Sequence, residues 1–165
     1  MAADVSFDVV SEFDRQELVN ALDQARREIG TRYDFKGARA ELELGKDEIL
    51  LRADSESRAR AMRDLLESKA IRRGLSLKIF DWGEVEEAGG NTVRQRIGLR
   101  SGLPEDLAKK ISKLIRDEFP KTKSQIQGDA VRVSGKNKDD LQRVISRLRE
   151  ESDGYPVALQ FQNYR

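Results

Sequence analysis

Residues 45–52 read GKDEILLR and residues 128–133 read GDAVRV, and these two stretches decide the predicted fold. Each has a glycine at a turn and then alternating apolar residues, a pattern that predicts a β-hairpin and its return strand. The offset from Asp47 to Asp129 is 82 residues, and the same offset superposes the apolar positions of the segment after each hairpin. Those positions are Ala59, Met62 and Leu66 in the first copy and Leu141, Val144 and Leu148 in the second. The chain therefore contains one structural plan twice.

The first half extends from its hairpin in both directions. Residues 5–10, VSFDVV, alternate as a strand, and Asp14 with Glu17 forms a capping box at the start of a helix. Residues 81–92, DWGEVEEAGGNT, lose this periodicity and are interpreted as a linker. The predicted elements are a strand at 5–10, a helix beginning after Asp14, a hairpin of 39–44 and 49–53, a helix at 55–73 and a strand at 75–79.

The second half repeats this order. Its predicted elements are a strand at 93–99, a helix between Pro104 and Pro120, a hairpin of 123–127 and 130–134, a helix after Asn137 and a strand at 157–161. Each half is β-α-β-β-α-β, which predicts an α+β protein with two ferredoxin-like domains in tandem, each an antiparallel sheet with two helices on one face. The simplest boundaries are 1–90 and 91–165. A terminal strand that crosses over to complete the other half's sheet is the alternative.

Charge differs between these halves. Residues 1–90 hold 15 Lys/Arg against 20 Asp/Glu, whereas residues 91–165 hold 16 against 10. Because cationic surfaces gain most from contact with phosphate, the basic second half predicts a phosphate-bearing partner.

Strand alternation predicts which side chains point away from the helices. On the second half's open face it predicts five cations, three amides and no carboxylate: Arg94, Arg96, Arg100, Lys123, Arg132, Gln125, Gln127 and Gln160. Arginine donates two hydrogen bonds to phosphate, and glutamine both donates to and accepts from a base edge. This face is therefore predicted to bind a nucleotide or nucleic acid. A face that is simply polar, as in many solvated sheets, is the alternative.

Aromatic residues are missing from this predicted face. Stacking on a base would therefore come from Tyr155, from Tyr164 or from the turn that holds Tyr33 and Phe35. The same turn also carries Lys36, so it is interpreted either as a ring-plus-cation contact or as a helix end whose rings seal the core.

Residues 128–137 resemble a phosphate-binding loop only superficially. Six residues separate the two glycines instead of four, and Asn137 replaces the Ser or Thr that holds magnesium. Lys136 nevertheless precedes a predicted helix N-terminus, where backbone N–H groups can bind an anion. A turn glycine followed by a solvated lysine is the alternative.

Composition excludes several classes of function. The chain contains no Cys and no His, which excludes disulfides, thiolate nucleophiles, imidazole bases and metal sites built from these residues. No catalytic residue, metal or cofactor is therefore expected. No run approaches the roughly 18 apolar residues of a membrane span, and the first residues lack the pattern of a signal peptide. A cytoplasmic monomer that does not associate with membranes is expected.

Five ordered blocks spread over the chain carry a resemblance. They are residues 6–12 (SFDVVSE), 32–37 (RYDFKG), 125–133 (QIQGDAVRV), 135–136 with 139–142 (GK and DDLQ) and 160–165 (QFQNYR). In these blocks the sequence resembles the YajQ family of small bacterial proteins. The resemblance implies two ferredoxin-like domains of the RNA-binding type and a nucleotide-binding role. It further implies nucleoside triphosphates, RNA or cyclic di-GMP as ligands, a transcription regulator as a partner and no catalytic residues.

The predicted function is non-enzymatic binding of a nucleotide, such as cyclic di-GMP, ATP or GTP, or of RNA. The alternative is a protein-interaction adaptor of transcription or signalling, in which the acidic first half docks a basic partner and nucleotide binding is incidental. The candidate nucleotide contacts are Arg32, Phe35, Lys36, Arg94, Arg96, Gln125, Gln127, Arg132, Lys136, Asn163 and Arg165.

Overall fold

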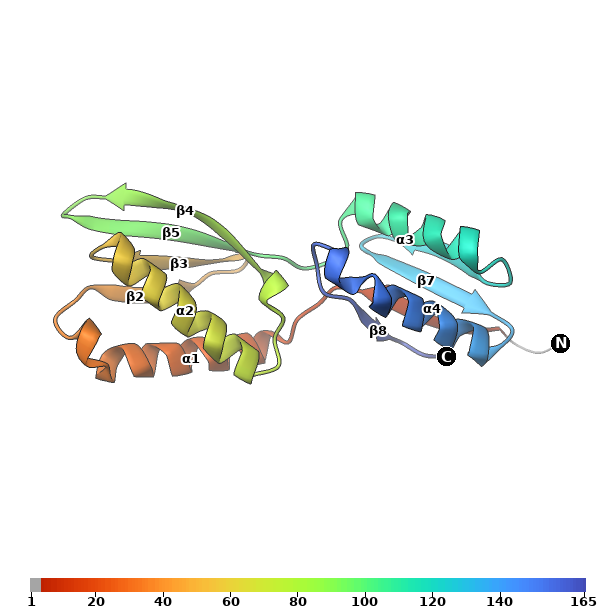
Figure 1. Ribbon diagram of the computed structural model, residues 1–165, viewed down its shortest axis with the longest axis horizontal. Coiled ribbons are helices and arrows are strands. Elements are labelled where there is room, and N and C mark those ends of the chain that lie inside the picture. Colours follow the sequence, from red (N-terminus) through yellow and green to blue (C-terminus); the bar gives the residue numbers. More distant parts are fainter. Residues whose placement is uncertain (1–3) are drawn as a thin grey trace. The chain divides into compact units, whose positions relative to one another are not determined.

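The computed structural model describes residues 4–165, which divide into two compact units (Figure 1). Unit 1 contains the residues through Glu12 together with Ser101–Arg165, and unit 2 contains Phe13–Arg100. Among the described residues no helix is long and apolar enough to cross a bilayer.

Unit 1 is a four-stranded antiparallel sheet with two helices on one face. The strands lie in the order β6-β7-β1-β8. In chain order the elements run β-α-β-β-α-β, which is the ferredoxin-like arrangement predicted from the sequence. They are β1 (Val5–Val10), α3 (Glu105–Glu118), β6 (Lys123–Gln127), β7 (Ala130–Gly135), α4 (Lys138–Glu150), the 3₁₀ turn η3 (Ser152–Gly154) and β8 (Gln160–Gln162).

Unit 2 has the same layers, and its strands lie in the order β2-β3-β5-β4. Strand β5 occupies the place in this sheet that β1 occupies in unit 1. The elements are α1 (Arg15–Thr31), the 3₁₀ turn η1 (Tyr33–Phe35), β2 (Ala40–Leu44), β3 (Glu48–Ala53), α2 (Glu56–Arg72), the 3₁₀ turn η2 (Leu77–Ile79), β4 (Phe80–Ala88) and β5 (Thr92–Leu99).

The two halves of the chain have exchanged their first strands, so the expected boundary near residue 90 is wrong. Residue 90 lies inside the β4–β5 hairpin, where Ala88 pairs with Thr92. Gly90 and Asn91 adopt φ angles of 72° and 59°, a left-handed backbone that glycine and asparagine tolerate best. This tight turn holds β5 beside β4, so β5 stays in unit 2 and leaves its place in unit 1 to β1.

Three other predicted elements differ from the structure. Residues 81–92 are strand and turn instead of a linker, because β4 pairs along β5 with one irregularity between Trp82 and Val85. Leu77–Ile79 forms a 3₁₀ turn instead of a strand, and the last strand begins at Gln160 instead of residue 157. The helix start at Asp14 is confirmed, because its carboxylate accepts hydrogen bonds from the backbone N–H groups of Gln16 and Glu17.

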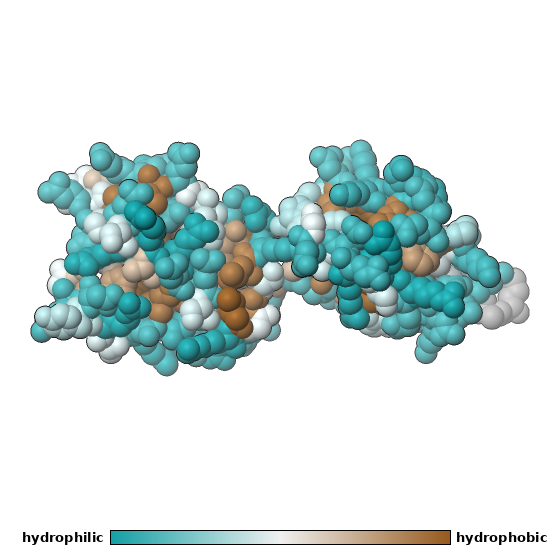
Figure 2. All heavy atoms as spheres, viewed as in Figure 1, coloured by the Kyte–Doolittle hydropathy of each residue, from teal (hydrophilic) through white to brown (hydrophobic). Residues whose placement is uncertain are grey.

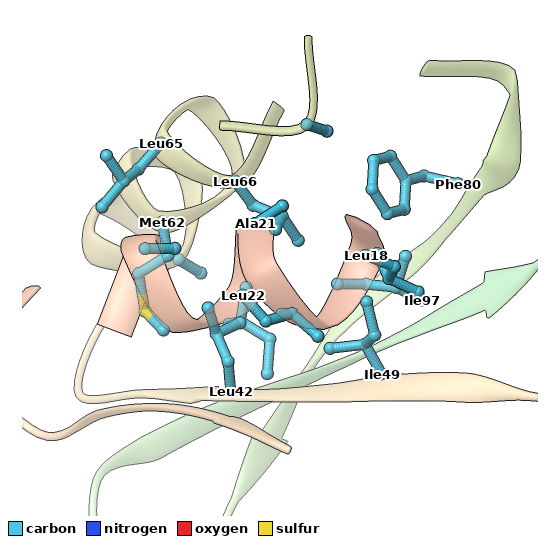
Figure 3. Close-up of a cluster of buried hydrophobic side chains, with 14 of the residues drawn as sticks. Leu18, Ala21, Leu22, Leu42, Ile49, Met62, Leu65, Leu66, Phe80 and Ile97 are labelled. Carbon is cyan, nitrogen blue, oxygen red and sulfur yellow. The ribbon is translucent and has the colours of Figure 1, made fainter. Parts of the chain in front are cut away.

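Each unit buries a core of its own between its helices and its sheet. In unit 2, Leu18 and Leu22 of α1 and Met62 and Leu66 of α2 pack over Ile49 of β3 (Figure 3). In unit 1 the core joins β1 and β7 to helices α3 and α4, with these members among others: Phe7, Val9, Ile111, Ile115, Val133, Val144 and Leu148. On the helix-covered faces only strips of apolar surface are visible between hydrophilic side chains (Figure 2).

The charge contrast between the halves also disappears with the strand exchange. Unit 1 holds 13 Lys/Arg and 13 Asp/Glu, and unit 2 holds 18 and 17. Neither unit is basic as a whole, so a functional surface must be sought in local pairing of charges and not in net charge.

Candidate functional site

The structure brings only some of the predicted contacts together. Six of the eleven lie in unit 1: Gln125, Gln127, Arg132, Lys136, Asn163 and Arg165. The other five lie in unit 2: Arg32, Phe35, Lys36, Arg94 and Arg96.

Arg94 and Arg96 are the clearest correction. Both were expected beside Arg132, but β5 pairs with β3 and β4, so they lie on the open face of unit 2. There Arg94 Nε donates to Glu86 at 3.1 Å, and Arg96 Nη1 donates to Glu48 at 3.0 Å. A carboxylate already neutralises each guanidinium, which removes the reason for proposing a phosphate contact.

The turn η1 was interpreted either as a ring-plus-cation ligand contact or as a helix end whose rings seal the core, and its two rings behave differently. The Phe35 ring is buried in the core of unit 2, as the sealing interpretation expects, whereas the Tyr33 side chain is 89% exposed. Arg32 donates to both Asp34 carboxylate oxygens, at 3.0 and 2.7 Å. This pairing raises the pKa of Arg32 above its usual value and lowers the pKa of Asp34. The pair is exposed and local, so the Tyr33 ring is the group that η1 leaves available to a ligand.

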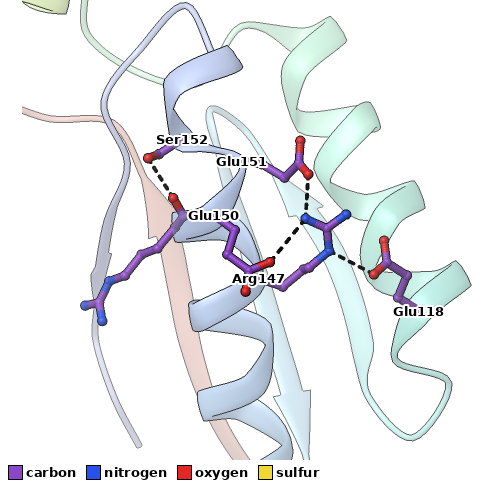
Figure 4. Close-up of polar contacts among 6 residues, drawn as sticks. Glu118, Arg147, Glu150, Glu151 and Ser152 are labelled. Atoms are coloured by element: carbon purple, nitrogen blue, oxygen red, sulfur yellow. Dashed lines mark hydrogen bonds and ion pairs between the residues drawn. The ribbon is translucent and has the colours of Figure 1, made fainter.

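The cations on the helix side of unit 1 are largely paired. Arg147 of α4 donates from Nε to Glu118 of α3 at 2.9 Å and from Nη1 to Glu151 (Figure 4). These hydrogen bonds raise the pKa of Arg147 still further above its usual value. Tyr155, one expected source of base stacking, is also on this side and is only 3% exposed. The helix side therefore contributes to stability and offers little to a charged ligand.

The open face of unit 1 contains an acid that the sequence interpretation placed elsewhere. Asp8 of β1 pairs across the sheet with Arg132 of β7, which pairs in turn with Gln125 of β6. Arg132 Nε donates to Asp8 Oδ1 at 3.0 Å, and Asn163 Nδ2 donates to Asp8 Oδ2 at 2.9 Å. The prediction of a face without carboxylates is wrong. It failed because Asp8 was assigned to the other half of the chain together with β1.

Asp8 is 8% exposed, and its surroundings keep it ionised. Burial by itself would raise the pKa of Asp8. Hydrogen bonds from Arg132 and Asn163 and the charges of Arg132 and Arg165 outweigh that effect, and the pKa lies below its ordinary value.

The C-terminal residues are held against β1. Arg165 and Ser6 exchange two backbone hydrogen bonds, each 3.0 Å long. Asn163 adopts a φ of 57°, the left-handed conformation that asparagine tolerates. Its amide is committed to Asp8, so Asn163 and Arg165 act first as parts of the fold and only secondarily as candidate ligand contacts.

Two neighbouring hollows lie beside β6 and β7. The larger, about 590 Å³, is lined by Arg116, Lys123, Gln125 and Arg132 among others, and contains no carboxylate. The smaller, about 450 Å³, is lined by Lys121, Lys123, Lys136, Asp4 and Asp140 among others. Lys123 and Ser134 line both hollows, so the two meet at the end of the β6–β7 hairpin away from its turn.

The lysines at this junction are not paired with acids. Lys121, Lys123 and Lys136 form no ion pair with any residue in 4–165, whereas Asp140 is paired with Arg143 at 3.7 Å. Helix α4 begins here, and the side chain of its capping residue Asn137 accepts from the N–H of Asp139. Lys121 and Ser134 were not predicted, and Lys123 was predicted on the open face but was not among the candidate contacts. All three could have been predicted as contacts from their positions next to the β6–β7 hairpin, but only after β6 and β7 had been placed in one sheet with β1.

No group of three or more His, Cys, Asp or Glu residues within 4–165 is arranged to hold a metal ion. What the junction offers is a concentration of ammonium and guanidinium groups beside a side-chain amide. Such groups bind anionic oxygens, and the amide can recognise a polar edge of the same ligand.

Comparison with known proteins agrees with this chemistry. Residues 5–165 match a family described as nucleotide-binding protein YajQ-like. A protein of Trichormus variabilis named as a nucleotide-binding protein is 58% identical over 165 residues, which cover the whole of both chains. Proteins with the same name from Chloroflexus aggregans and Roseiflexus castenholzii are 56% and 53% identical, again over the full length of both chains.

Proposed function

The chain belongs to the YajQ-like family of nucleotide-binding proteins, and we propose that it binds a nucleotide in unit 1, at the junction of the two hollows beside β6 and β7. The observation that carries this proposal is the set of three unpaired lysines, Lys121, Lys123 and Lys136, around one junction in a unit with no net charge. A nucleotide supplies the phosphates that these lysines lack as partners.

Phosphates would lie at the lysine end and the base toward the sheet. The smaller hollow takes the phosphates, where Lys121, Lys123 and Lys136 provide compact positive charges and α4 begins. The base lies in the larger hollow along β6, where Gln125 presents both a donor and an acceptor. Arg132 holds its place through Asp8 and still lines this hollow.

A small nucleotide fits better than a long RNA strand. The larger hollow, at about 590 Å³, falls within the range typical of small-molecule sites. Single-stranded RNA would need aromatic rings for successive bases, and no strand residue on this face is aromatic. ATP, GTP and cyclic di-GMP are therefore the first ligands to test, and RNA is the second.

The test is calorimetric titration of ATP, GTP, cyclic di-GMP and a short single-stranded RNA into the full chain. Lys123→Ala should weaken binding of the preferred nucleotide by about tenfold, the effect of one charged hydrogen bond. Arg96→Ala is the matched control, since it removes a cation from the open face of unit 2. Equal losses in the two variants would contradict the proposed site. For RNA, log affinity should fall steeply with log salt concentration, by a slope of about −0.7 for each phosphate contacted, whereas a small nucleotide should give a shallower fall.

The proposed function is binding without turnover; the chain has no His to act as an imidazole base and no Cys to act as a thiolate nucleophile. Incubation of the bound nucleotide with magnesium, followed by chromatography, should return it unchanged. A protein-interaction role in the cytoplasm, with a transcription regulator as one partner class, is the second candidate. The observation that favours it is an unpaired strand edge in unit 1.

A further inference from the structure

The outer edge of β6 differs from the edge of its counterpart in unit 2. Strand β6 is the first strand of the β6–β7 hairpin and lies at one side of its sheet, as β2 does in the β2–β3 hairpin. The two hairpins align at the offset of 82 residues, which places Ser124 on Leu42. The edges can therefore be compared residue by residue.

The backbone groups that β6 directs outward follow from the sheet register. Ser6 exchanges both backbone hydrogen bonds with Arg165, so Ser6 directs its groups away from β7. Successive residues of an antiparallel strand direct these groups to alternate sides, so Phe7 bonds to its partner Val133. Val133 is thereby occupied by β1, and its partner on β6, Ser124, directs its N–H and carbonyl outward.

Ile126 lies two residues after Ser124 on β6, so its backbone N–H and carbonyl also point outward, away from β7. No other residue within 4–165 forms a hydrogen bond to the backbone N–H or carbonyl of Ser124 or Ile126. The Ile126 side chain is 42% exposed beside these groups. One edge of β6 thus presents the donors, acceptors and apolar contact that a further strand would use.

The corresponding edge of unit 2 is closed by its own helix. Arg26 of α1 donates from Nε and Nη2 to the carbonyl of Leu42, at 3.0 and 2.7 Å. Arg26 also pairs with Asp23 at 3.1 Å, which fixes its position on the helix. The carbonyl that would receive an added strand at β2 already has its donors.

Unit 1 has an arginine at the same position, Arg116, but its guanidinium does not bind the backbone of the edge strand. Arg116 follows the first residue of α3 by the same interval as Arg26 follows the first residue of α1. Arg116 forms no hydrogen bond or ion pair with any residue in 4–165, and its side chain lines the larger hollow beside Ser124. The guanidinium and the outward carbonyl of β6 are both free.

We propose that the β6 edge binds an extended peptide segment of a partner protein that carries acidic side chains, added to the sheet as a fifth strand. The larger hollow reaches both faces of β6, since its lining includes Ser112 and Arg116 of α3 as well as Gln125 and Arg132 of the open face. A strand in this position projects alternate side chains to these two faces.

Charge decides the chemistry of the partner. Arg116 and Lys123 line the hollow without an ion pair in residues 4–165, and no carboxylate lines it, so carboxylates on the added strand complete the charge balance. The third cation of the lining, Arg132, is already paired with Asp8. An apolar side chain of the added strand, placed between its acidic residues, contacts Ile126.

The added strand lies in the hollow that the proposed function assigns to the base, so peptide and nucleotide should compete for it. The two proposals are still tested separately, because this one depends on the backbone edge and on Arg116, whereas Lys136 lines the smaller hollow and not the larger one.

The test uses the isotope-labelled full chain and a short capped peptide of alternating Glu and Val, with an alternating Lys and Val peptide as the charge control. The acidic peptide should bind and protect the Ser124 and Ile126 amides from hydrogen exchange, whereas the basic one should not. N-methylation of every second peptide residue, which removes donors from one strand edge, should weaken binding by about tenfold.

Two protein variants locate the contact. Ile126→Pro removes an outward N–H that forms no bond within the sheet, so the fold should survive while peptide affinity falls at least about tenfold. Ile126→Ala keeps the N–H and should lose about twofold to threefold. Arg116→Ala should lose about fivefold, and Arg26→Ala in unit 2 should lose nothing.

Three results would contradict the proposal. Equal binding of the basic peptide, or wild-type affinity in both Ile126→Pro and Arg116→Ala, would overturn it. If the wild-type chain sediments as a dimer that Ile126→Pro dissociates, a second copy occupies the edge instead. Should Ile126→Pro fail to fold, Arg116→Ala and the N-methylated peptide still decide the question. Lys136→Ala should weaken nucleotide binding and leave peptide binding unchanged, which separates this inference from the proposed function.

Discussion

The two sheets of this protein share one fold but differ in how the cations on their open faces are paired with carboxylates. In unit 2 each of four arginines lies within 3.5 Å of a carboxylate, in these pairs: Arg39–Glu41, Arg94–Glu86, Arg96–Glu48 and Arg100–Asp81. On the open face of unit 1, within residues 4–165, Arg132 is the one arginine paired in this way, and the nearby Lys121, Lys123 and Lys136 remain without acids.

The difference teaches that local pairing, and not net charge, marks a binding surface. Unit 2 has the larger number of cations, yet four arginines of its face are paired with carboxylates, and Arg52 is the arginine of that face without an ion pair in residues 4–165. Exposed pairs of this kind contribute little to stability, about 0–1 kcal/mol each, but they occupy the groups that a phosphate would need. Unit 1 leaves its lysines available and uses one buried pair, Asp8 with Arg132, to hold the face in place.

The largest expected effect tests the strand exchange itself. Phe7→Ala removes a fully buried ring from β1 and should cost about 3–5 kcal/mol of unfolding free energy. The loss should fall on unit 1, because β1 pairs with β7 and β8. Hydrogen exchange should increase at the amides of β7 and remain unchanged in β3. Faster exchange in β3 alone would restore the boundary near residue 90.

Ile97→Ala is the mirror experiment. Ile97 of β5 is fully buried in the core of unit 2, so the change should cost about 2–5 kcal/mol and increase exchange in β3. If hydrogen exchange increased in β7 alone, β5 would belong to the sheet of unit 1, and the strand exchange would be contradicted.

The next effect concerns the buried carboxylate of unit 1. Asp8→Asn should cost about 1–3 kcal/mol at neutral pH, because Arg132 loses its ionic partner in a mostly buried position. Glu86→Gln, which breaks an exposed pair in unit 2, is the control and should cost less than about 1 kcal/mol. Chemical denaturation of both variants measures the difference.

The same carboxylate gives a pH dependence with a defined sign. The pKa of Asp8 is lower in the folded chain than the value of about 3.9 expected when unfolded, so its stabilisation is complete above that unfolded value. It is lost as the pH falls through the lower, folded pKa. The gap in stability between the wild type and Asp8→Asn should therefore close in strong acid. A gap that persists there would show that shape, and not charge, is responsible.

The next prediction compares ligand binding by the two open faces. Lys136→Ala should weaken nucleotide binding by about fivefold to tenfold, since it removes one phosphate contact. Glu48→Gln releases Arg96 in unit 2 and should change binding by less than about twofold, because the proposed nucleotide site lies in unit 1. Strong new binding in Glu48→Gln would show that charge alone is sufficient.

The smallest expected effect compares the two equivalent arginines. Arg26→Ala should cost about 0.5–1.5 kcal/mol, because the Leu42 carbonyl loses two hydrogen bonds. Arg116→Ala should change stability by less than about 0.5 kcal/mol, because its guanidinium has no partner in the described chain. Thermal unfolding of the two variants, side by side, provides the measurement. Equal losses would mean that Arg116 also supports the fold.

Much of the candidate site could be predicted from the sequence. Gln125, Gln127, Arg132 and Lys136 were identified from strand alternation and from the helix start, and the structure places all four in unit 1. Gln125, Arg132 and Lys136 line the two hollows of the proposed site, whereas Gln127 lines neither. Arg94 and Arg96 were misplaced because strand alternation assigns a side chain to a face but does not say to which sheet the strand belongs. Asp8 was missed for the same reason.

The sequence by itself determined the β2–β3 and β6–β7 hairpins, the four helices and the repeat, because turn residues and apolar periodicity act over a few residues. It did not determine the β4–β5 hairpin, which was interpreted as a linker. It could not determine which sheet received β1 and β5, because several strands of similar apolar pattern compete for the same central place. The three-residue turn at Gly89–Asn91 decided that competition in the folded chain. Only the tertiary structure therefore placed Asp8 beside Arg132, left Arg116 without a partner and brought the unpaired lysines together.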